Sequence, residues 1–257
     1  MNYSPCTYQF SGVTTRVAGY SKIPPKILEQ IFSIRKLAFI DRKKWDIESY
    51  QGSDYEWDEY DDLDATYIYT HQNDQVTGCV RLRPSSKPTL MSGPLSFILP
   101  AEETRAHLQH CWEATRFALS SDDFATGELT QANVDIRTAA LFLSMIKFAQ
   151  QQNVRTYEIV VDTMMEKILK RSGWTVDRRN IALGSKGEKI IYGTLPCTLL
   201  TYEEVLKKNA IHKATVYHQP LITCRSSDSL DKPQVIPQTL PNRNIPAKIS
   251  MHTVLQL

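Results

Sequence analysis

The segment from Asp54 to Asp64 concentrates chemistry that is rare elsewhere in the chain. Seven of its eleven residues are acidic, whereas the whole chain of 257 residues has 28 acids and a net charge of +2. Three aromatic residues, Tyr55, Trp57 and Tyr60, are interleaved with the acids. Blocks of like charge are usually solvated or disordered. This block is unusual because an apolar run, typical of a strand, follows it directly.

Several arginines and one glutamate are candidates to complete a polar site. Arg81 and Arg83 alternate in GCVRLRP and so share one face of a strand, while Glu113 and Arg116 lie in CWEATRFAL. An odd separation puts Glu113 and Arg116 on opposite faces of an ideal strand, so a β-bulge is needed to bring them together. Arg35 falls on an apolar helical stripe, either as a snorkelling side chain or as a cation aimed into a cleft. Taken singly, each of the strand residues is more often part of a surface ion pair, whereas spacing alone does not decide between the two interpretations of Arg35.

Apolar periodicity indicates the elements that would position these residues. Helices are predicted at 24–45, 135–153 and 163–173, and strands at 65–84 (a hairpin), 111–119, 155–163, 174–182 and 188–196. In helix 163–173 we predict a capping box from Thr163 to Glu166 and termination at Gly173. This order favours helices that flank a mixed sheet, in an α/β or α+β fold.

Composition and motifs exclude several classes of protein. No apolar run reaches eighteen residues and no signal peptide is evident, so we expect a cytoplasmic protein without a membrane span. Five scattered cysteines form no disulfide framework, and neither GxGxxG nor GxxxxGK is present. His107, His110 and Cys111 are spaced for one helix face, but no second cluster offers further ligands, and we expect no metal.

The composition changes toward the C-terminus. From about Ser226 the chain is rich in proline and poor in apolar residues, which is typical of disorder. We therefore expect a domain at 1–205 with a short N-terminal extension, followed by a C-terminal extension at 206–257.

Taken in order, the candidate residues follow the pattern of a known family. The order is Arg35 with Phe39, then Trp45, then EWDEYD at 56–61, GCVRL at 78–82 and EATR at 113–116. This series resembles the acyl-homoserine-lactone synthases, the autoinducer synthases of bacterial quorum sensing, over residues 28–195. Each piece alone is weak evidence, whereas the ordered set is specific.

The resemblance implies a fold similar to the GCN5-related acetyltransferases, an α/β fold with a mixed sheet, flanking helices and a V-shaped cleft. It implies synthesis of an N-acyl-homoserine lactone from S-adenosylmethionine and the thioester of an acyl-carrier protein, or of acyl-CoA in some members. Acylation of the amine is followed by lactone closure, which releases methylthioadenosine. S-adenosylmethionine is then a substrate, so no cofactor is expected, and neither nucleic acid nor a membrane is an expected partner.

The resemblance also implies where S-adenosylmethionine binds. Asp58 and Asp61 would form the centre of its pocket, while the remaining acids of the block need no role beyond a solvated loop. Arg35, Phe39 and Trp45 would come from the N-terminal segment that closes over the substrate.

The chemistry requires a base. An α-amino group titrates at about pH 7.7–8.0, so at pH 7 most of it is protonated and cannot attack. Glu113 is the predicted base, directly or through a water, and Arg116 and Asp58 are the other predicted catalytic residues. Arg81 and Arg116 would hold the carboxylates in place or bind the substrate carboxylate, since the guanidinium fork suits either task.

Residues of the strand at 155–163 and of the helix that follows it concern the acyl donor. Ile159, a predicted substrate contact, stands where members that make 3-oxo-acyl products usually have threonine, and it offers no hydroxyl. Asp162 stands where serine is often found. Lys167, Lys170 and Arg171 either offset a helix dipole or dock an acidic acyl-carrier protein, and we favour docking.

Two rival functions fit the sequence less well. An ordinary acetyltransferase of the same fold normally carries a Gln/Arg-x-x-Gly-x-Gly/Ala loop for CoA, and we find none in this chain. A non-catalytic module that binds S-adenosylmethionine or acyl-carrier protein would not require both Glu113 and Arg116.

Overall fold

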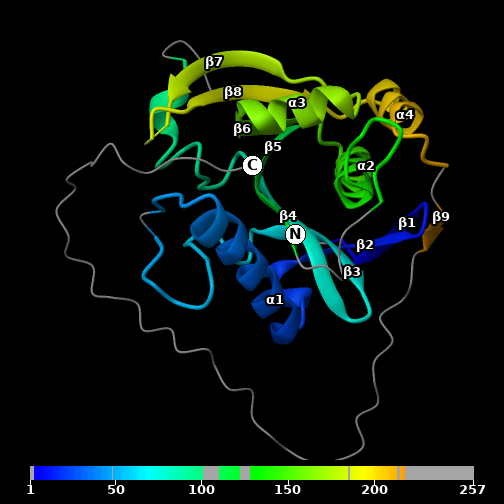
Figure 1. Ribbon diagram of the computed structural model, residues 1–257, viewed down its shortest axis with the longest axis horizontal. Coiled ribbons are helices and arrows are strands. Elements are labelled where there is room, and N and C mark those ends of the chain that lie inside the picture. The colour runs from blue at the N-terminus through cyan, green and yellow to red at the C-terminus, as the bar shows by residue number, and fades with distance from the viewer. Residues whose placement is uncertain are drawn as a thin grey trace, which may run out of the picture.

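One mixed sheet with helices on its faces positions the candidate residues (Figure 1). The computed structural model describes residues 3–47, 49–100, 110–121, 128–184, 186–212 and 215–217. The helical elements are η1 (Tyr20–Lys22), α1 (Pro25–Arg35), the π-helix η2 (Lys36–Arg42), η3 (Ser96–Ile98), α2 (Ile136–Gln151), α3 (Thr163–Arg171) and α4 (Leu199–Lys208). The strands are β1 (Cys6–Phe10), β2 (Val13–Gly19), β3 (Thr66–Gln72), β4 (Gln75–Pro84), β5 (Cys111–Leu119), β6 (Thr156–Asp162), β7 (Asp177–Leu183), β8 (Lys189–Pro196) and β9 (Thr215–Tyr217).

The sheet opens in its middle. Its order is β7-β8-β6-β5-β4-β3-β2-β1-β9, with β5 and β6 parallel and the other neighbours antiparallel. Both β5 and β6 are described along their full lengths, yet they pair only where Cys111–Glu113 meets Thr156–Glu158. Beyond Glu113 and Glu158 the two strands diverge, which confirms the expected α/β fold with a V-shaped opening in the sheet.

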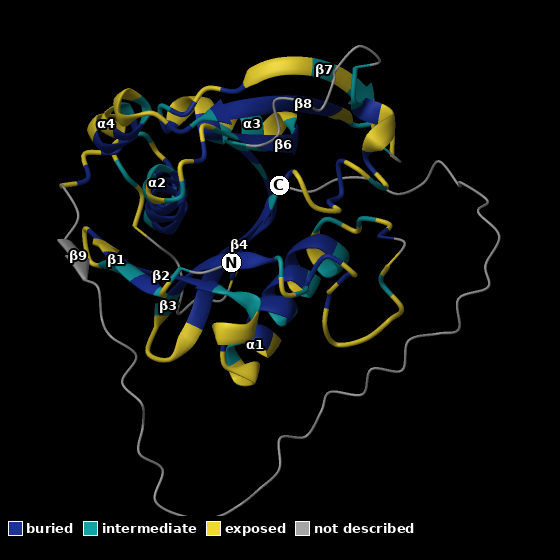
Figure 2. Cartoon of the chain, turned by 180° about the vertical axis from the view of Figure 1, so that it is seen from behind, coloured by how far each residue is buried: buried dark blue, intermediate teal, exposed yellow. Residues whose placement is uncertain are grey.

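The two faces of the sheet have different partners. Residues of a strand alternate between faces, so β4 directs Val80 and Leu82 into the cluster that contains α2, and Cys79 into the cluster that contains α1. Helix α2 is buried along most of its length, as Figure 2 shows. The face toward α1 also receives Arg81 and Arg83 from β4, and this is where the polar site forms.

Several predicted elements are confirmed. Strand β5 coincides with the predicted strand at 111–119, and α2 begins after Asp135, whose side chain accepts the Arg137 N–H as an N-cap. The hairpin of β3 and β4 turns at Asn73 and Asp74, whose φ angles of 50° and 63° suit a turn with two left-handed residues. The termination of α3 at Gly173, with φ of 87°, is also confirmed.

Other predictions were wrong. The N-cap of α3 is Asp162, which accepts the Met165 N–H, whereas Thr163 is the first helical residue, so the predicted capping box from Thr163 to Glu166 is not formed. The predicted helix at 24–45 is α1 followed by a π-helix that ends at Arg42. The hairpin of β1 and β2 and the helix α4 were not predicted at all.

The packed unit extends beyond the expected boundary at residue 205. Helix α4 runs to Lys208, and Leu206 and Ile211 belong to the same core cluster as α2. The expected disordered tail from about 226 lies outside the described residues. None of the helices in the described residues is long and apolar enough to cross a membrane.

The packing of α4 can be tested with two leucines of the same helix. Leu206 is 6% exposed and Leu200 is 76% exposed. Leu206→Ala should lower the free energy of unfolding by about 2–5 kcal/mol because it opens a cavity in the core, whereas Leu200→Ala should change it by less than about 0.5 kcal/mol. Urea unfolding of both variants decides the matter, and equal small losses would show that α4 adds nothing to the core.

Candidate active site

Three arginines from three elements meet in the interior of the molecule. Arg35 comes from the end of α1, Arg81 from β4 and Arg116 from β5. Each of these side chains is at most 1% exposed. The snorkelling interpretation of Arg35 is therefore wrong, because its head is held inside the protein rather than in water.

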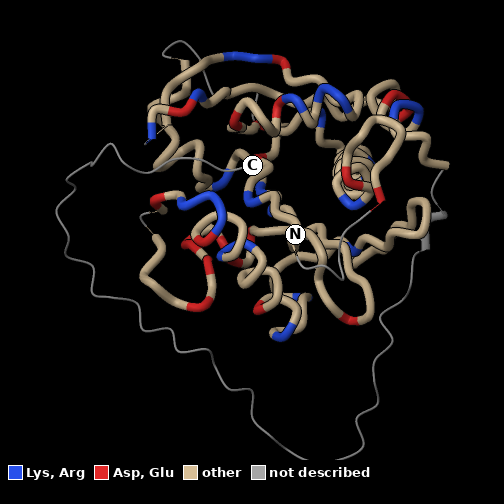
Figure 3. Tube along the Cα trace, in the orientation of Figure 1, with Lys and Arg blue, Asp and Glu red and all other residues tan. Residues whose placement is uncertain are grey.

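Three carboxylates from one loop balance these cations. Along the acidic segment, Glu56, Asp58 and Asp61 are buried, while Asp54 and Glu59 are exposed. Figure 3 shows acidic and basic segments meeting beside α1. The expectation of solvated acids outside the motif is confirmed for Asp54 and Glu59.

Arg35 and Arg81 share the carboxylate of Asp61. Arg35 donates to both oxygens of Asp61 from its two terminal nitrogens, at 2.8 and 2.9 Å, and to Glu56 from Nε at 2.6 Å. Arg81 Nη1 donates to Asp58 at 2.5 Å and to Asp61 at 2.7 Å, and Nη2 donates to Asp58 at 3.1 Å. The carboxylates thus link a helix to a strand.

The loop is also held by its own backbone and by β3 and β4. The Asp58 N–H donates to Asp61 Oδ2 at 2.8 Å, and the Tyr67 hydroxyl donates to Asp61 Oδ1. Arg83 donates to the Tyr60 carbonyl at 2.7 Å and to Asp62. Because both oxygens of Asp61 are occupied by protein donors, this arrangement favours a positioning role for Asp61 over direct substrate contact.

A β-bulge brings Arg116 to the cluster. The register of β4 against β5 shifts between Cys79 and Arg81, so that β5 carries one residue more than its partner. Arg116 lies in this bulge with φ of 59°, a left-handed conformation that is uncommon for residues with side chains. The bulge allows Arg116 and Glu113 to lie on one face despite their odd separation, and the sequence prediction of a bulge is confirmed.

The cluster shifts the ionisation of its acids. Burial alone would raise the pKa of Asp61, but Arg35 and Arg81 outweigh burial and hold that pKa well below its usual range. The same balance, with Arg81 and Arg116 as the cations, lowers the pKa of Asp58. Asp58 and Asp61 therefore stay ionised beside the arginines that neutralise them.

Arg116 differs from Arg81 in how many of its donors are used. Each terminal nitrogen and Nε of Arg81 has an acceptor, the last being the Thr115 hydroxyl at 3.4 Å. Arg116 uses Nη2, which donates to Asp58 at 2.5 Å and lies 2.9 Å from Glu56. Its Nε and Nη1 are buried and have no hydrogen-bond partner within the described residues. Arg116 thus keeps two donors for a ligand.

Glu113 lies at the point where β5 and β6 diverge. Its side chain is fully buried, and its carboxylate accepts the N–H groups of Met91 at 2.7 Å and of Leu90 at 3.3 Å. Burial raises the pKa of Glu113 above its usual value, against the opposing effects of these hydrogen bonds and of Arg81. A carboxylate of raised pKa accepts a proton more readily, as a general base must.

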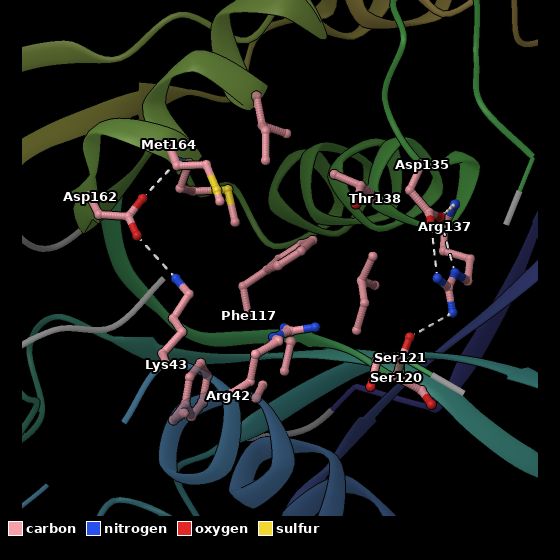
Figure 4. A pocket seen from close by; sticks show the side chains of 16 residues that line it. Arg42, Lys43, Phe117, Ser120, Ser121, Asp135, Arg137, Thr138, Asp162 and Met164 are labelled. Atoms are coloured by element: carbon pink, nitrogen blue, oxygen red, sulfur yellow. Dashed lines mark hydrogen bonds and ion pairs between the residues drawn. The ribbon is translucent and has the colours of Figure 1, made fainter. Parts of the chain in front are cut away.

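The N-terminal segment borders an apolar cavity of about 400 Å³ beside the diverging strands (Figure 4). Phe39 and Trp45 stack with ring centroids 5.2 Å apart, and Phe39 lines the cavity. Lys43 contacts the Trp45 ring and donates to Asp162 at 3.0 Å, across the cavity mouth. Its other apolar lining comes from η2, β5 and α3, and its polar lining includes Arg42 and Arg137.

The remaining predicted residues lie away from the arginine cluster. Ile159 is fully buried in the core cluster that contains α2. Lys167, Lys170 and Arg171 are exposed on α3 and line an open groove of about 620 Å³, together with Lys208 from α4. This groove adds a fourth cation that the sequence did not indicate. The weighed metal ligand His107 lies outside the described residues.

Sequence reasoning missed three members of the polar site. Glu56 was present in the quoted motif but was given no role, although it pairs with both Arg35 and Arg116. Tyr67 carried no signal beyond its place in a strand. Arg83 was predicted to share a strand face with Arg81. That spacing of two residues was the available indication that Arg83 also belongs to the polar site.

Comparison with known proteins shows the family to which the chain is similar. The family model described as autoinducer synthase matches residues 21–205. A probable acyl-homoserine-lactone synthase of Sinorhizobium fredii is 28% identical over 185 residues, which cover 72% of this chain and 86% of that protein. The acyl-homoserine-lactone synthase of Pseudomonas amygdali pv. tabaci is 26% identical over 205 residues, covering 79% and 87%.

Solved structures show the same fold. The AHL synthase LasI superposes with a TM-score of 0.64 at 21% identity, covering 77% of this chain and 94% of that chain. The CoA-dependent synthase BjaI, solved with SAM and isopentyl-CoA, gives 0.62 at 19% identity, covering 76% and 88%. The chain therefore belongs to the autoinducer synthase family, the acyl-homoserine-lactone synthases. It is an acyltransferase, as its sequence predicts.

The cluster yields a prediction about stability. Asp61→Asn leaves three arginines against two carboxylates, and breaking a buried ion pair costs about 3–5 kcal/mol, so unfolding at pH 7 should show a loss of that size. The folded-state pKa of Asp61 is lowered, so its stabilisation is present above the unfolded-state value of about 3.9 and is lost as the pH falls toward the folded-state value. The difference between variant and wild type should therefore shrink in acid.

Asp54→Asn is the matched control from the same loop. Asp54 is exposed, so its replacement should change the free energy of unfolding by less than about 0.5 kcal/mol. Equal losses of unfolding free energy in the two variants would mean that the acids act through the net charge of the segment rather than through specific ion pairs.

Proposed function

We propose that this protein synthesises an N-acyl-homoserine lactone from S-adenosylmethionine and an acyl thioester. The amine of S-adenosylmethionine attacks the thioester, and lactone closure then releases methylthioadenosine. The observation that carries the proposal is the pair of unpartnered donors of Arg116, held beside the fork of the sheet near Glu113. The family membership and the ordered motifs support the same reaction.

The arginine–carboxylate cluster serves as a wall that fixes Arg116. Its Nη2 is held by Asp58 and approached by Glu56, while the unpaired Nη1 at the end of the side chain remains to donate to the substrate carboxylate. The three carboxylates are already neutralised by arginines, so the aromatic faces of Phe39 and Trp45 are better candidates for contact with the substrate cation.

Glu113 acts as the general base of the acylation. It accepts the amine proton, directly or through a water, as the nitrogen attacks the thioester carbon. For lactone closure, the carboxylate oxygen attacks the carbon that is bonded to sulfur. Sulfonium is a good leaving group, so positioning of the carboxylate by Arg116 suffices for this step.

The acyl donor occupies the opening between β5 and β6. The apolar cavity, with Phe39, Phe117 and Ile168 in its lining, suits an acyl chain. The diverging strand edges offer backbone groups to an extended thioester arm. BjaI is described as CoA-dependent, but the exposed cations of α3 favour an acidic acyl-carrier protein as the donor here, through the groove of Lys167, Lys170, Arg171 and Lys208.

The proposal also covers the cellular compartment of the reaction, its cofactor requirement and its product. We place the reaction in the cytoplasm, because the described cysteines are free thiols and fit a reducing compartment. No cofactor takes part, since S-adenosylmethionine is consumed. Ile159 provides no hydroxyl, so the product lacks a 3-oxo group.

The direct test is product analysis. The protein is incubated with S-adenosylmethionine and with acyl-carrier-protein or CoA thioesters of different acyl chains, and mass spectrometry is used to look for lactone and methylthioadenosine. Both products must form together. A different acylated product without methylthioadenosine indicates an ordinary acetyltransferase, and binding without any product indicates a non-catalytic module.

Replacing the base should slow the acylation. Glu113→Gln should lower kcat by about 10²–10⁴-fold, the contribution of a positioned general base. Burial raises the pKa of Glu113, so wild-type kcat should rise as the pH increases through that raised value, and the variant should lose this limb. The exposed Glu59, changed to Gln, serves as the control. A Glu113→Gln variant with wild-type kcat from pH 6 to 8 excludes the role.

The docking groove can be tested through the donor. Replacing Lys167 and Arg171 by Ala should raise KM for the carrier-protein thioester but not for the CoA thioester of the same acyl group. The effect should weaken as salt rises, since the Debye length falls from about 10 Å at 0.1 M to about 3 Å at 1 M. Lys26→Ala, an exposed cation on α1, is the control.

Two results would contradict docking. If the double variant keeps its KM for the carrier-protein thioester but melts at a lower temperature, the cations of α3 serve the helix dipole alone. If the wild type prefers the CoA thioester, the premise of a carrier-protein surface fails.

A further inference from the structure

A second buried carboxyl group lies beside Glu113 at the fork of the sheet. Glu158 is the register partner of Glu113, and they form the last pair before β5 and β6 diverge. Neighbouring strands lie about 4.8 Å apart, so the two backbones are adjacent. Glu113 accepts the Met91 N–H and Glu158 accepts the Tyr192 hydroxyl, and both partners belong to one apolar cluster. The two carboxyl groups therefore share one face.

The hydrogen bonding of Glu158 is incomplete. The residue is 2% exposed, and its Oε1 accepts the Tyr192 hydroxyl at 2.9 Å. Its Oε2 is buried and has no hydrogen-bond partner within the described residues. A buried polar atom without a partner is costly and requires an explanation. Contact of this oxygen with a substrate atom during the reaction provides one.

We propose that Glu158 is a second proton-transfer residue of the acylation, which donates a proton from Oε2 to the sulfur that leaves the acyl donor. The proposal rests on the proposed function and adds the task that Glu113 does not fulfil. Glu113 takes a proton from the attacking amine, and Glu158 supplies a different proton to the sulfur as the carbon–sulfur bond breaks, so that neither residue has to do both tasks in one step.

The protons and electrons balance over the cycle. The amine nitrogen forms a bond to the thioester carbon and its proton passes to Glu113, while the carbon–sulfur bond breaks with its electron pair on sulfur. The proton of Glu158 passes to that sulfur and gives the thiol. Transfer from Glu113 to the adjacent Glu158 then restores the starting state. The hydrogen bond from the Tyr192 hydroxyl keeps Glu158 in place.

The test is a leaving-group comparison on the full chain. Glu158→Gln keeps the size of the side chain and an acceptor for Tyr192. With the CoA thioester of the acyl group that the wild type uses fastest, the variant should show a kcat lowered about 10²-fold. With the 4-nitrothiophenyl ester of the same acyl group, whose thiolate leaves without a proton, the defect should shrink by about tenfold or more. A merely structural role predicts equal defects with both donors.

Two comparisons complete the experiment. Glu113→Gln should show the same defect with both donors, because its role concerns the amine. The exposed Glu203, changed to Gln, should match the wild type. An unaffected Glu158→Gln variant, or a defect of equal size with both donors, overturns the assignment of Glu158. A wild type that forms neither lactone nor methylthioadenosine overturns the proposed function itself.

Discussion

The site depends on buried ion pairs between three arginines and the carboxylates of one loop. The arginines are Arg35, Arg81 and Arg116. Desolvating six charges is costly, and the cost is offset only if every charge has partners of good geometry. The chain therefore has to bring the end of α1, two strands and an irregular loop to one point. The loop path, the bulge at Arg116 and the inward direction of Arg35 follow from that requirement.

The same constraint explains why an acidic segment can lie inside a protein of nearly neutral charge. Glu56 and Asp58 lie in the interior, whereas Asp54 and Glu59 are exposed to water. The interior members are neutralised by arginines, so they need no ligand to be stable. What remains for a ligand is the unused part of Arg116, which a fully paired cluster would not leave available.

Features that depend on the residues of a single helix or strand could be predicted from the sequence. Features that depend on contacts between different elements could not. The need for a bulge followed from the odd spacing of Glu113 and Arg116, because strand geometry alone demands it. Asp162 was not predicted as the cap of α3, since a Thr one residue later satisfied the same rule. The pairing of Glu56, the contribution of Lys208 and the register of Glu158 against Glu113 depend on three-dimensional neighbours, and no local pattern reports them.

The divergence of β5 and β6 divides the site into two arms, and the two arms differ in how well they tolerate amino-acid substitutions. The arm of β4 and β5 carries Glu113 as well as Arg81 and Arg116, and a change to either arginine unbalances a buried cluster of six charges. The arm of β6 takes no part in that cluster. It carries Ile159, where members that make 3-oxo products usually have threonine, and Asp162, where serine is often found. Under the proposed function, donor preference can therefore change on β6 while the arm that binds the amine stays intact, because the two arms share only three paired positions at the base of the V.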